Sequence, residues 1–138
     1  MKAIATIGTT FRTDLKVGAG LEHSLVSDEP KEDGGENAGP TAMGLLAAAL
    51  GACTAATLRS YANHKGIKLD SVTVEVDASR RKPSEQAAAG EEAKATVVTK
   101  KITLQGDMTE EQRARMLEIA EKCPVNKALI QGVDLIHE

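Results

Sequence analysis

The chain is almost devoid of aromatic side chains. Its 138 residues include one phenylalanine, one tyrosine and no tryptophan. Because aromatic residues normally supply much of the apolar area that a core buries, this core has to be aliphatic and rich in alanine. At this length a single domain over residues 1–138 is the simplest organisation, and it would bury about two-thirds of its unfolded surface.

An excess of positive charge is also missing. The chain carries 17 Lys and Arg against 20 Asp and Glu, for a net charge of −3. Proteins that bind nucleic acid or anionic membranes present basic surfaces, so neither partner is expected. The first residues, MKAIATIGTT, lack the sustained apolar segment of a signal peptide. The sequence therefore predicts a cytoplasmic protein.

Cysteine and histidine are few. Two cysteines in a reducing compartment make a poor structural framework and a better redox or catalytic pair. The three histidines, His23, His64 and His137, do not have metal-ligand spacing to either cysteine. No metal site is expected.

What the sequence does contain is a long uncharged segment, residues 40–58, with Cys53 inside it. Thr41 is expected to cap the start of a helix, and Gly66 to end it in the left-handed conformation. No polar face appears before Arg59, and a helix that is apolar all round must be surrounded on all sides. We predict a central, buried helix with a thiol in its middle.

A membrane span is the alternative for this segment, whose length approaches the requirement. However, it consists mostly of Ala, Gly and Thr, whereas Leu, Ile, Phe and Val favour insertion by about 0.3 to 0.6 kcal/mol each. No second such segment exists and no basic cluster flanks this one. The core helix of a soluble protein is the preferred interpretation.

Strands are expected on both sides of this helix, from β-favouring residues and from apolar–polar alternation. The expected strands are residues 3–8, short pieces within 15–27, residues 71–78, residues 93–104 and a closing strand at 133–136. Residues 80–92 are expected to form a long exposed hairpin tip. The acidic segment 28–39 is interpreted as a solvated loop, or as a rim beside the buried helix.

The last third of the chain is expected to hold two helices. Thr109 and Gln112 form a capping box that opens the first, and Pro124 ends it and opens a short second helix that stops at Gly132. The apolar stripe of the first helix is expected to comprise Met116, Leu117 and Ala120.

The order of these elements indicates an α+β fold, with antiparallel sheets and helices around the long central helix. A few short strands and one amphipathic helix cannot cover an apolar helix that is about 36 Å long. A second copy of the chain is the economical source of the remaining cover, so we predict an obligate homodimer.

The two cysteines allow different interpretations. Cys53 is either a small core residue or a nucleophile, and burial raises a thiol pKa, so a nucleophile there needs a nearby cation or hydrogen-bond donors. Cys123 is either a structural residue or a reactive one. As the N-cap of the Pro124 helix it would lie near free N–H groups that favour a thiolate. At the end of the preceding helix it would face the negative end of the helix dipole, which disfavours a thiolate. The sequence leaves these alternatives open.

Several motifs together resemble the OsmC/Ohr family, the osmotically inducible protein C and organic hydroperoxide resistance proteins. The motifs are DEP at 28–30, GG at 34–35, GP at 39–40, LGACTA at 50–55 and KCPV at 122–125. The resemblance covers most of the chain from Asp28 onward. It implies an intertwined α+β homodimer that reduces organic hydroperoxides with two cysteines in each active site.

By that resemblance Cys53 is the peroxidatic nucleophile and Cys123 is the resolving thiol. Attack on the peroxide gives a sulfenic acid at Cys53, which condenses with Cys123 to a disulfide. A dithiol reductant such as a lipoylated protein then restores both thiols by exchange, without a metal or an organic cofactor. Arg12 has about the position of the family's activating arginine, and Lys16 is a weaker candidate.

One feature of the family is missing. Its members usually carry a glutamate nine or ten residues before the first cysteine, where this chain has Gly44 and Met43. Glu36 in the acidic loop is the candidate for the replacement carboxylate. A peroxidase acting on alkyl or lipid hydroperoxides is therefore the leading hypothesis. A weakened relative that binds an apolar ligand or senses redox state, or a purely structural dimer, is the alternative.

Overall fold

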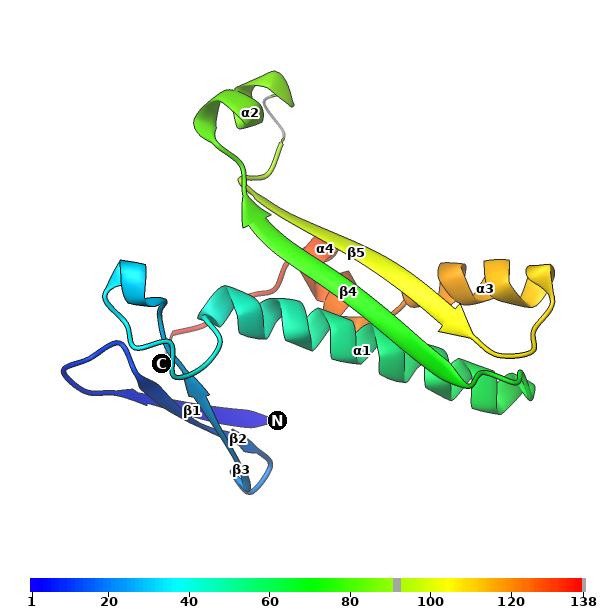
Figure 1. The fold of residues 1–138 in the computed structure, drawn as a ribbon, viewed down its shortest axis with the longest axis horizontal. Coiled ribbons are helices and arrows are strands. Elements are labelled where there is room, and N and C mark those ends of the chain that lie inside the picture. The colour runs from blue at the N-terminus through cyan, green and yellow to red at the C-terminus, as the bar shows by residue number, and fades with distance from the viewer. Residues whose placement is uncertain (91–92, 138) are drawn as a thin grey trace. The chain divides into compact units, whose positions relative to one another are not determined.

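The computed structural model describes residues 1–90 and 93–137. The chain divides into two compact units, Met1–Leu46 and Ala47–Glu138. The fold is α+β, with antiparallel sheets and a long central helix, as the sequence predicts (Figure 1).

The first unit contains a three-stranded antiparallel sheet in the order β1-β2-β3. Its strands are β1 (Lys2–Ile7), β2 (Thr13–Gly18) and β3 (His23–Ser27). The register pairs Lys2 with Gly18 and Thr13 with Ser27. The strands predicted from β-favouring residues in this part of the chain are confirmed.

The acidic segment after β3 is organised around one buried carboxylate. It includes a short 3-10 helix, η1 (Lys31–Asp33), but Asp28 at its start is only 2 % exposed. The Asp28 carboxylate accepts backbone N–H groups from Glu29 at 2.9 Å, Glu36 at 3.1 Å and Ala38 at 3.0 Å. The Ala38 N–H lowers the pKa of Asp28 most, burial opposes it, and the other two N–H groups and the charge of Arg12 lower it further.

Helix α1 (Ala42–Lys65) has the predicted ends. The Thr41 hydroxyl oxygen accepts the Gly44 N–H at 3.1 Å, as an N-cap does. Gly66 has a φ of +64°, the left-handed conformation that ends a helix.

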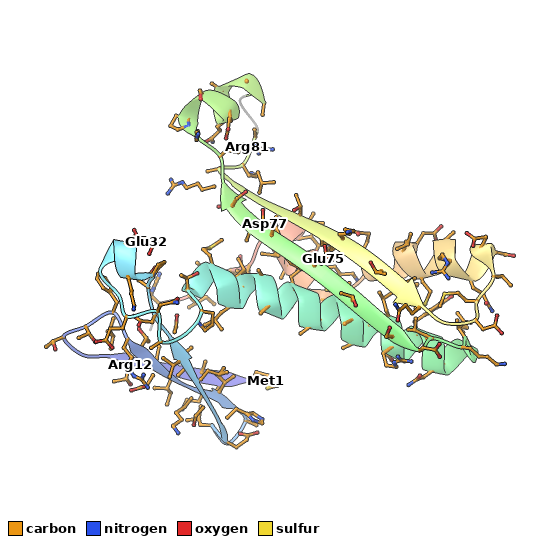
Figure 2. All side chains as sticks on the ribbon, viewed as in Figure 1. Met1, Arg12, Glu32, Glu75, Asp77 and Arg81 are labelled. Atoms are coloured by element: carbon orange, nitrogen blue, oxygen red, sulfur yellow. The ribbon has the colours of Figure 1, made fainter. Side chains whose placement is uncertain are left out.

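In the second unit, β4 (Ser71–Arg80) and β5 (Thr96–Gln105) form an antiparallel hairpin. Alternate residues of β4 are half-buried, whereas Glu75 and Asp77 are exposed (Figure 2). A Cβ at Gly51 of α1 would lie 3.5 Å from a methyl carbon of Val76. Strand β4 therefore packs against α1 at Gly51, with room for a Cβ at ordinary van der Waals distance.

The hairpin tip differs from the prediction, because it contains a short helix, α2 (Pro83–Ala88). Pro83 occupies the first helical position, where its fixed φ favours a helix, and the Glu85 carboxylate accepts the Lys82 N–H at 2.9 Å. Residues 91 and 92, the last of the predicted tip, lie outside the described residues.

Two further helices follow β5, α3 (Glu110–Ala120) and α4 (Pro124–Gln131). The capping box of Thr109 and Gln112 is confirmed. The predicted apolar stripe is wrong at Leu117, which is 45 % exposed, whereas Ile119 is buried. The core of the unit joins α1, β5 and α3 with the segment before β4. Its buried members are Leu58, Ala62, Leu69, Leu104, Met116, Ile119 and Ala120.

The closing strand predicted at residues 133–136 is wrong. This segment is extended and exposed and belongs to neither sheet, whose members are β1–β3 and β4–β5. β-favouring residues make a strand only where a neighbouring strand supplies ladder hydrogen bonds, and in this chain no described strand pairs with them.

One stripe of α1 is buried within the chain. It comprises Leu50, Thr54, Leu58 and Ala62, spaced four residues apart. The prediction of a helix surrounded on all sides is therefore not met by one copy of the chain. Among the described residues, α1 alone is long and apolar enough to cross a membrane, and core helices of soluble proteins meet the same test.

Candidate active site

The two cysteines lie at different kinds of helical position. Cys53 is in the middle of α1 and half-buried. Cys123 is fully buried and is the N-cap of α4, where its sulfur accepts the Asn126 N–H at 3.3 Å. The choice that the sequence left open at Cys123 is thereby settled in favour of the start of the second helix.

The structure brings these cysteines together. Both thiols are free, and they lie close enough for each to shift the pKa of the other. Thr54, the residue after Cys53, donates its hydroxyl to the Cys123 sulfur across 3.7 Å. Thr54 belongs to the LGACTA motif but was not predicted as a site residue. Consecutive residues of a helix point in different directions, so its position next to Cys53 in the sequence does not show what its side chain contacts.

The thiols have opposite pKa shifts. Burial raises the pKa of Cys53, the Val125 N–H opposes this rise, and the hydrogen bond and charge of Cys123 add to it. Burial also acts to raise the pKa of Cys123, but the Asn126 N–H, the Cys53 thiol and the Thr54 hydroxyl together lower it below its ordinary value. When the pair has lost one proton, the Cys53 thiol therefore donates to a Cys123 thiolate.

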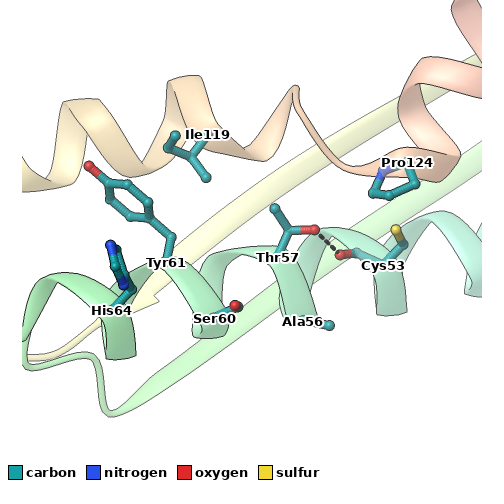
Figure 3. Close-up of a pocket in the computed structure, with 8 residues that line it drawn as sticks. All are labelled: Cys53, Ala56, Thr57, Ser60, Tyr61, His64, Ile119 and Pro124. Carbon is teal, nitrogen blue, oxygen red and sulfur yellow. Dashed lines mark hydrogen bonds between the residues drawn. The ribbon is translucent and has the colours of Figure 1, made fainter.

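A cavity of about 590 Å³ opens beside Cys53, and we call it the Cys53 groove. Figure 3 shows that α1 supplies most of its wall, with Ile119 of α3 and Pro124 of α4 opposite. The complete lining is Cys53, Ala56, Thr57, Ser60, Tyr61, His64, Ile119 and Pro124. Because Cys53 lines the groove and Cys123 is fully buried, a molecule in the groove meets Cys53 first.

A polar cluster lies at the junction of α3 and α4, beside Cys123. The Lys100 ammonium donates to the Asn126 side-chain oxygen at 3.0 Å and pairs with the Glu121 carboxylate at 3.0 Å. Asn126 in turn donates its amide to the Glu121 carbonyl oxygen at 3.1 Å. Sequence reasoning missed this cluster, because Lys100 is on β5 and 26 residues before Asn126.

Arg12 and Lys16, the predicted activating cations, are in the first unit (Figure 2). The Arg12 guanidinium lies 3.4 Å from the Asp14 carboxylate, and Lys16 donates to the Ser24 hydroxyl at 2.6 Å. Glu36 is in the loop around Asp28. Their roles toward Cys53 stay predictions.

Met43 and Gly44, where the family's glutamate would stand, both lie in the first turn of α1. Met43 is exposed within the chain. Among residues 1–90 and 93–137, no group of three or more His, Cys, Asp or Glu side chains is placed to hold a metal ion.

Comparison with known proteins places the chain among relatives of one kind. Residues 34–138 match the family model described as OsmC-like protein. No protein with a curated description matches the chain.

Several solved structures share the fold. An organic hydroperoxide resistance protein OsmC from Legionella pneumophila is 25% identical, with a TM-score of 0.66 over 96% of this chain and 90% of that one. An OsmC-like protein from Mycoplasma pneumoniae is 18% identical, with a TM-score of 0.74 over 96% and 87%. The organic hydroperoxide resistance protein OhrB of Bacillus subtilis is 21% identical, with a TM-score of 0.60 over 96% and 92%.

Proposed function

The chain belongs to the OsmC-like protein family, and from this premise we propose that it is a cysteine-dependent peroxidase that reduces organic hydroperoxides. A role in peroxide detoxification is supported by structural neighbours named organic hydroperoxide resistance proteins. The observation that carries the finer proposal is the thiol pair, with Cys53 on the groove and Cys123 buried against it.

The first step uses the proton that the two sulfurs share. The Cys123 thiolate accepts the Cys53 proton as a general base, so that Cys53 becomes the nucleophile. The Cys53 thiolate attacks the distal oxygen of the hydroperoxide, breaks the O–O bond and becomes a sulfenic acid. The alkoxide that leaves takes the proton from Cys123 and departs as an alcohol, which returns Cys123 to the thiolate.

The second step forms the disulfide. The Cys123 thiolate attacks the sulfur of the Cys53 sulfenic acid and expels hydroxide, which solvent protonates to water. The effect of each thiol on the pKa of the other supports this step, because it indicates that the side chains are neighbours in the reduced protein. A dithiol reductant, such as a lipoylated protein, then reduces the disulfide by exchange through a mixed disulfide.

The substrate preference follows from the walls of the groove. Pro124 lies across from Cys53, and Ala56 and Thr57 follow one turn along α1. Ile119 of α3 lies farther along the groove, near Tyr61, as do Ser60 and His64 of α1 (Figure 3). An apolar wall beside the reacting sulfur favours alkyl or lipid hydroperoxides over small hydrophilic ones.

Arg12 is our candidate for the cation that stabilises the Cys53 thiolate while it attacks. The need for a cation is supported by the raised pKa of Cys53, since burial disfavours its ionised form. With Arg12 in place, the proton transfer to Cys123 would leave a negative sulfur beside a positive charge.

We further propose a cytoplasmic homodimer. Large apolar side chains are exposed on α4 and in the tail after it, and soluble monomers rarely expose large contiguous apolar patches. These residues are Leu129, Ile130, Val133, Leu135 and Ile136. Sedimentation of the purified protein is expected to give twice the chain mass, and a monomer at micromolar concentration would contradict the proposal.

Peroxide consumption with a dithiol reductant tests the enzyme. Cys53→Ser is expected to abolish it, and wild-type turnover by this variant would remove the assignment. Ser60→Ala is the matched control, because Ser60 lines the same groove on α1 and takes no part in the proposed steps.

A redox-sensing or ligand-binding protein is the second candidate. It is favoured by the raised pKa of Cys53 and by Met43 and Gly44 in place of the family's glutamate. Alkylation of Cys53 across a range of pH discriminates the two. Alkylation that sets in near pH ~6 favours the enzyme, because Cys123 or Arg12 then makes Cys53 reactive in spite of its burial. Alkylation only above about 8.5, the value of a free thiol, favours the sensor.

A further inference from the structure

A largely buried lysine stands at the junction of α3 and α4. The Lys100 side chain is 12 % exposed. Its ammonium donates to the Ala120 carbonyl oxygen at 3.4 Å and to the Asn126 side chain at 3.0 Å, and it lies 3.0 Å from the Glu121 carboxylate. A buried ammonium carries a desolvation cost that such partners offset.

Cys123 lies between two helix ends of opposite polarity. Helix α3 ends at Ala120, where its last carbonyl groups form a negative end, and α4 begins at Pro124, where its first N–H groups form a positive end. A thiolate at Cys123 is therefore stabilised by α4 and destabilised by α3. The Asn126 N–H at 3.3 Å is the stabilising contact.

Lys100 acts on the destabilising side. It binds the Ala120 carbonyl oxygen at the negative end of α3, and it neutralises the Glu121 carboxylate that continues this end. Through the Asn126 side chain it also joins the first turn of α4. We propose that Lys100 is a positioning residue that keeps Cys123 ionised by cancelling the negative end of α3.

The ionisable groups near Cys123 come from three neighbouring elements. Helix α1 contributes the Cys53 thiol, β5 contributes Lys100, and the end of α3 contributes Glu121 and the exposed Lys122. The Glu121 side chain is 59 % exposed, so water screens its charge more than that of the buried Lys100. The Glu121 carboxylate therefore offsets only part of the positive charge of Lys100.

For the reaction, Lys100 would set how readily Cys123 acts as base and as resolving nucleophile. This consequence depends on the proposed peroxidase, because only the thiolate attacks the sulfenic acid. The effect on the pKa of Cys123 is a property of the reduced protein and needs no peroxide.

Titration of Cys123 in the full chain carrying Cys53→Ser tests the inference. The ultraviolet absorbance of the thiolate reports its ionisation without reagent access, and a variant lacking both cysteines corrects for Tyr61. Adding Lys100→Met is expected to raise the midpoint by about one pH unit, as for loss of a nearby opposite charge. Adding Glu121→Gln is expected to lower it, because Lys100 then stays unneutralised.

Lys101→Met is the matched control, since Lys101 is the next residue on β5, is 74 % exposed and pairs with Glu75. It is expected to leave the midpoint unchanged. Opposite shifts from Lys100→Met and Glu121→Gln distinguish electrostatics from loosened packing, which would move both the same way. Unchanged midpoints, or a rise with Glu121→Gln, would overturn the inference; should Lys100→Met fail to fold, the Glu121→Gln shift alone decides it.

Peroxide-driven disulfide formation in the chain with both cysteines separates the two proposals. Below the Cys123 midpoint, Lys100→Met is expected to slow it about tenfold, which is the loss of thiolate for a shift of one pH unit. A wild-type protein that forms no disulfide while the midpoints still shift would refute the peroxidase and leave the role of Lys100 standing.

Discussion

Cys53 and Cys123 each shift the pKa of the other and yet occupy opposite electrostatic environments. Cys53 lies in the interior of α1, where backbone N–H groups are already bonded within the helix. Cys123 caps α4, where the first N–H groups have no partner inside the helix. Burial raises the pKa of the first thiol, and the donors around the second outweigh burial and lower its pKa.

Position along a helix therefore determines which of the two neighbouring thiols has the lower pKa. The cysteine that a molecule in the groove can reach and the cysteine that ionises more readily are different residues. The thiol that lines the groove has the raised pKa, and the thiol with the lowered pKa is buried behind it. A reaction at Cys53 therefore needs the proton to move to Cys123, a cation such as Arg12, or both.

Removal of Cys123 is expected to have the largest effect. In Cys123→Ser the base and the resolving thiol are both lost, and general base catalysis alone contributes about 10²-fold or more. Steady-state peroxide consumption should fall by at least about this factor, while a sulfenic acid trap labels Cys53. Undiminished turnover would show that Cys53 does not need its neighbour.

Loss of packing between α1 and α3 is expected to disturb both thiols together. Leu58 is fully buried against Met116 and Ile119 in the core, so Leu58→Ala should lower the free energy of unfolding by about 3 kcal/mol. Denaturant titration measures this. The control Leu117→Ala removes a side chain that is exposed on α3, and an equal loss there would contradict the described core.

The order of the two pKa values is a direct test of the comparison. With one thiol left in each variant, Cys123 in Cys53→Ser should ionise at lower pH than Cys53 in Cys123→Ser, because only Cys123 caps a helix. Absorbance titration of both variants gives the order. The reverse order would mean that a charge outside the cysteine pair, such as Arg12, dominates.

The smallest effect is expected at Asp28, where N–H donors lower the pKa of a carboxyl group as they do for Cys123. A lowered folded-state pKa stabilises the fold above the unfolded value of about 3.9, and this contribution is lost as the pH falls through the folded-state pKa. Asp28→Asn should therefore lower the denaturant midpoint at pH 7 and lose this effect in strong acid. The exposed Asp33→Asn is the control in the same loop, and an equal deficit at both pH values would contradict the electrostatic origin.

Local signals in the sequence predict much of the fold. Thr41 and Gly66 mark the ends of α1, and the capping box at Thr109 marks the start of α3, because caps depend on neighbouring residues alone. Residues 133–136 have strand composition and form no strand, since pairing depends on a distant partner. Leu117 fits an apolar pattern but faces away from the core of the chain.

In the candidate site, too, residues in local motifs were predicted and residues that depend on distant contacts were not. The cysteines were found from motifs, and the position of Cys123 as a cap was one of the open alternatives. Thr54, Asn126 and Lys100 were missed, because their contacts join α1, α4 and β5 across 26 or more residues or depend on which way a side chain points. A single sequence does not specify such contacts between distant elements.

The linkage of the two sulfurs after oxidation tests the central claim most directly. Reduced protein would receive one equivalent of an organic hydroperoxide, be digested without reductant and be analysed by mass spectrometry. The account predicts a peptide pair joined through Cys53 and Cys123 and no such pair in Cys53→Ser. Consumption of the hydroperoxide with both cysteines still reduced, or with Cys53 oxidised beyond the sulfenic acid and Cys123 untouched, would contradict it.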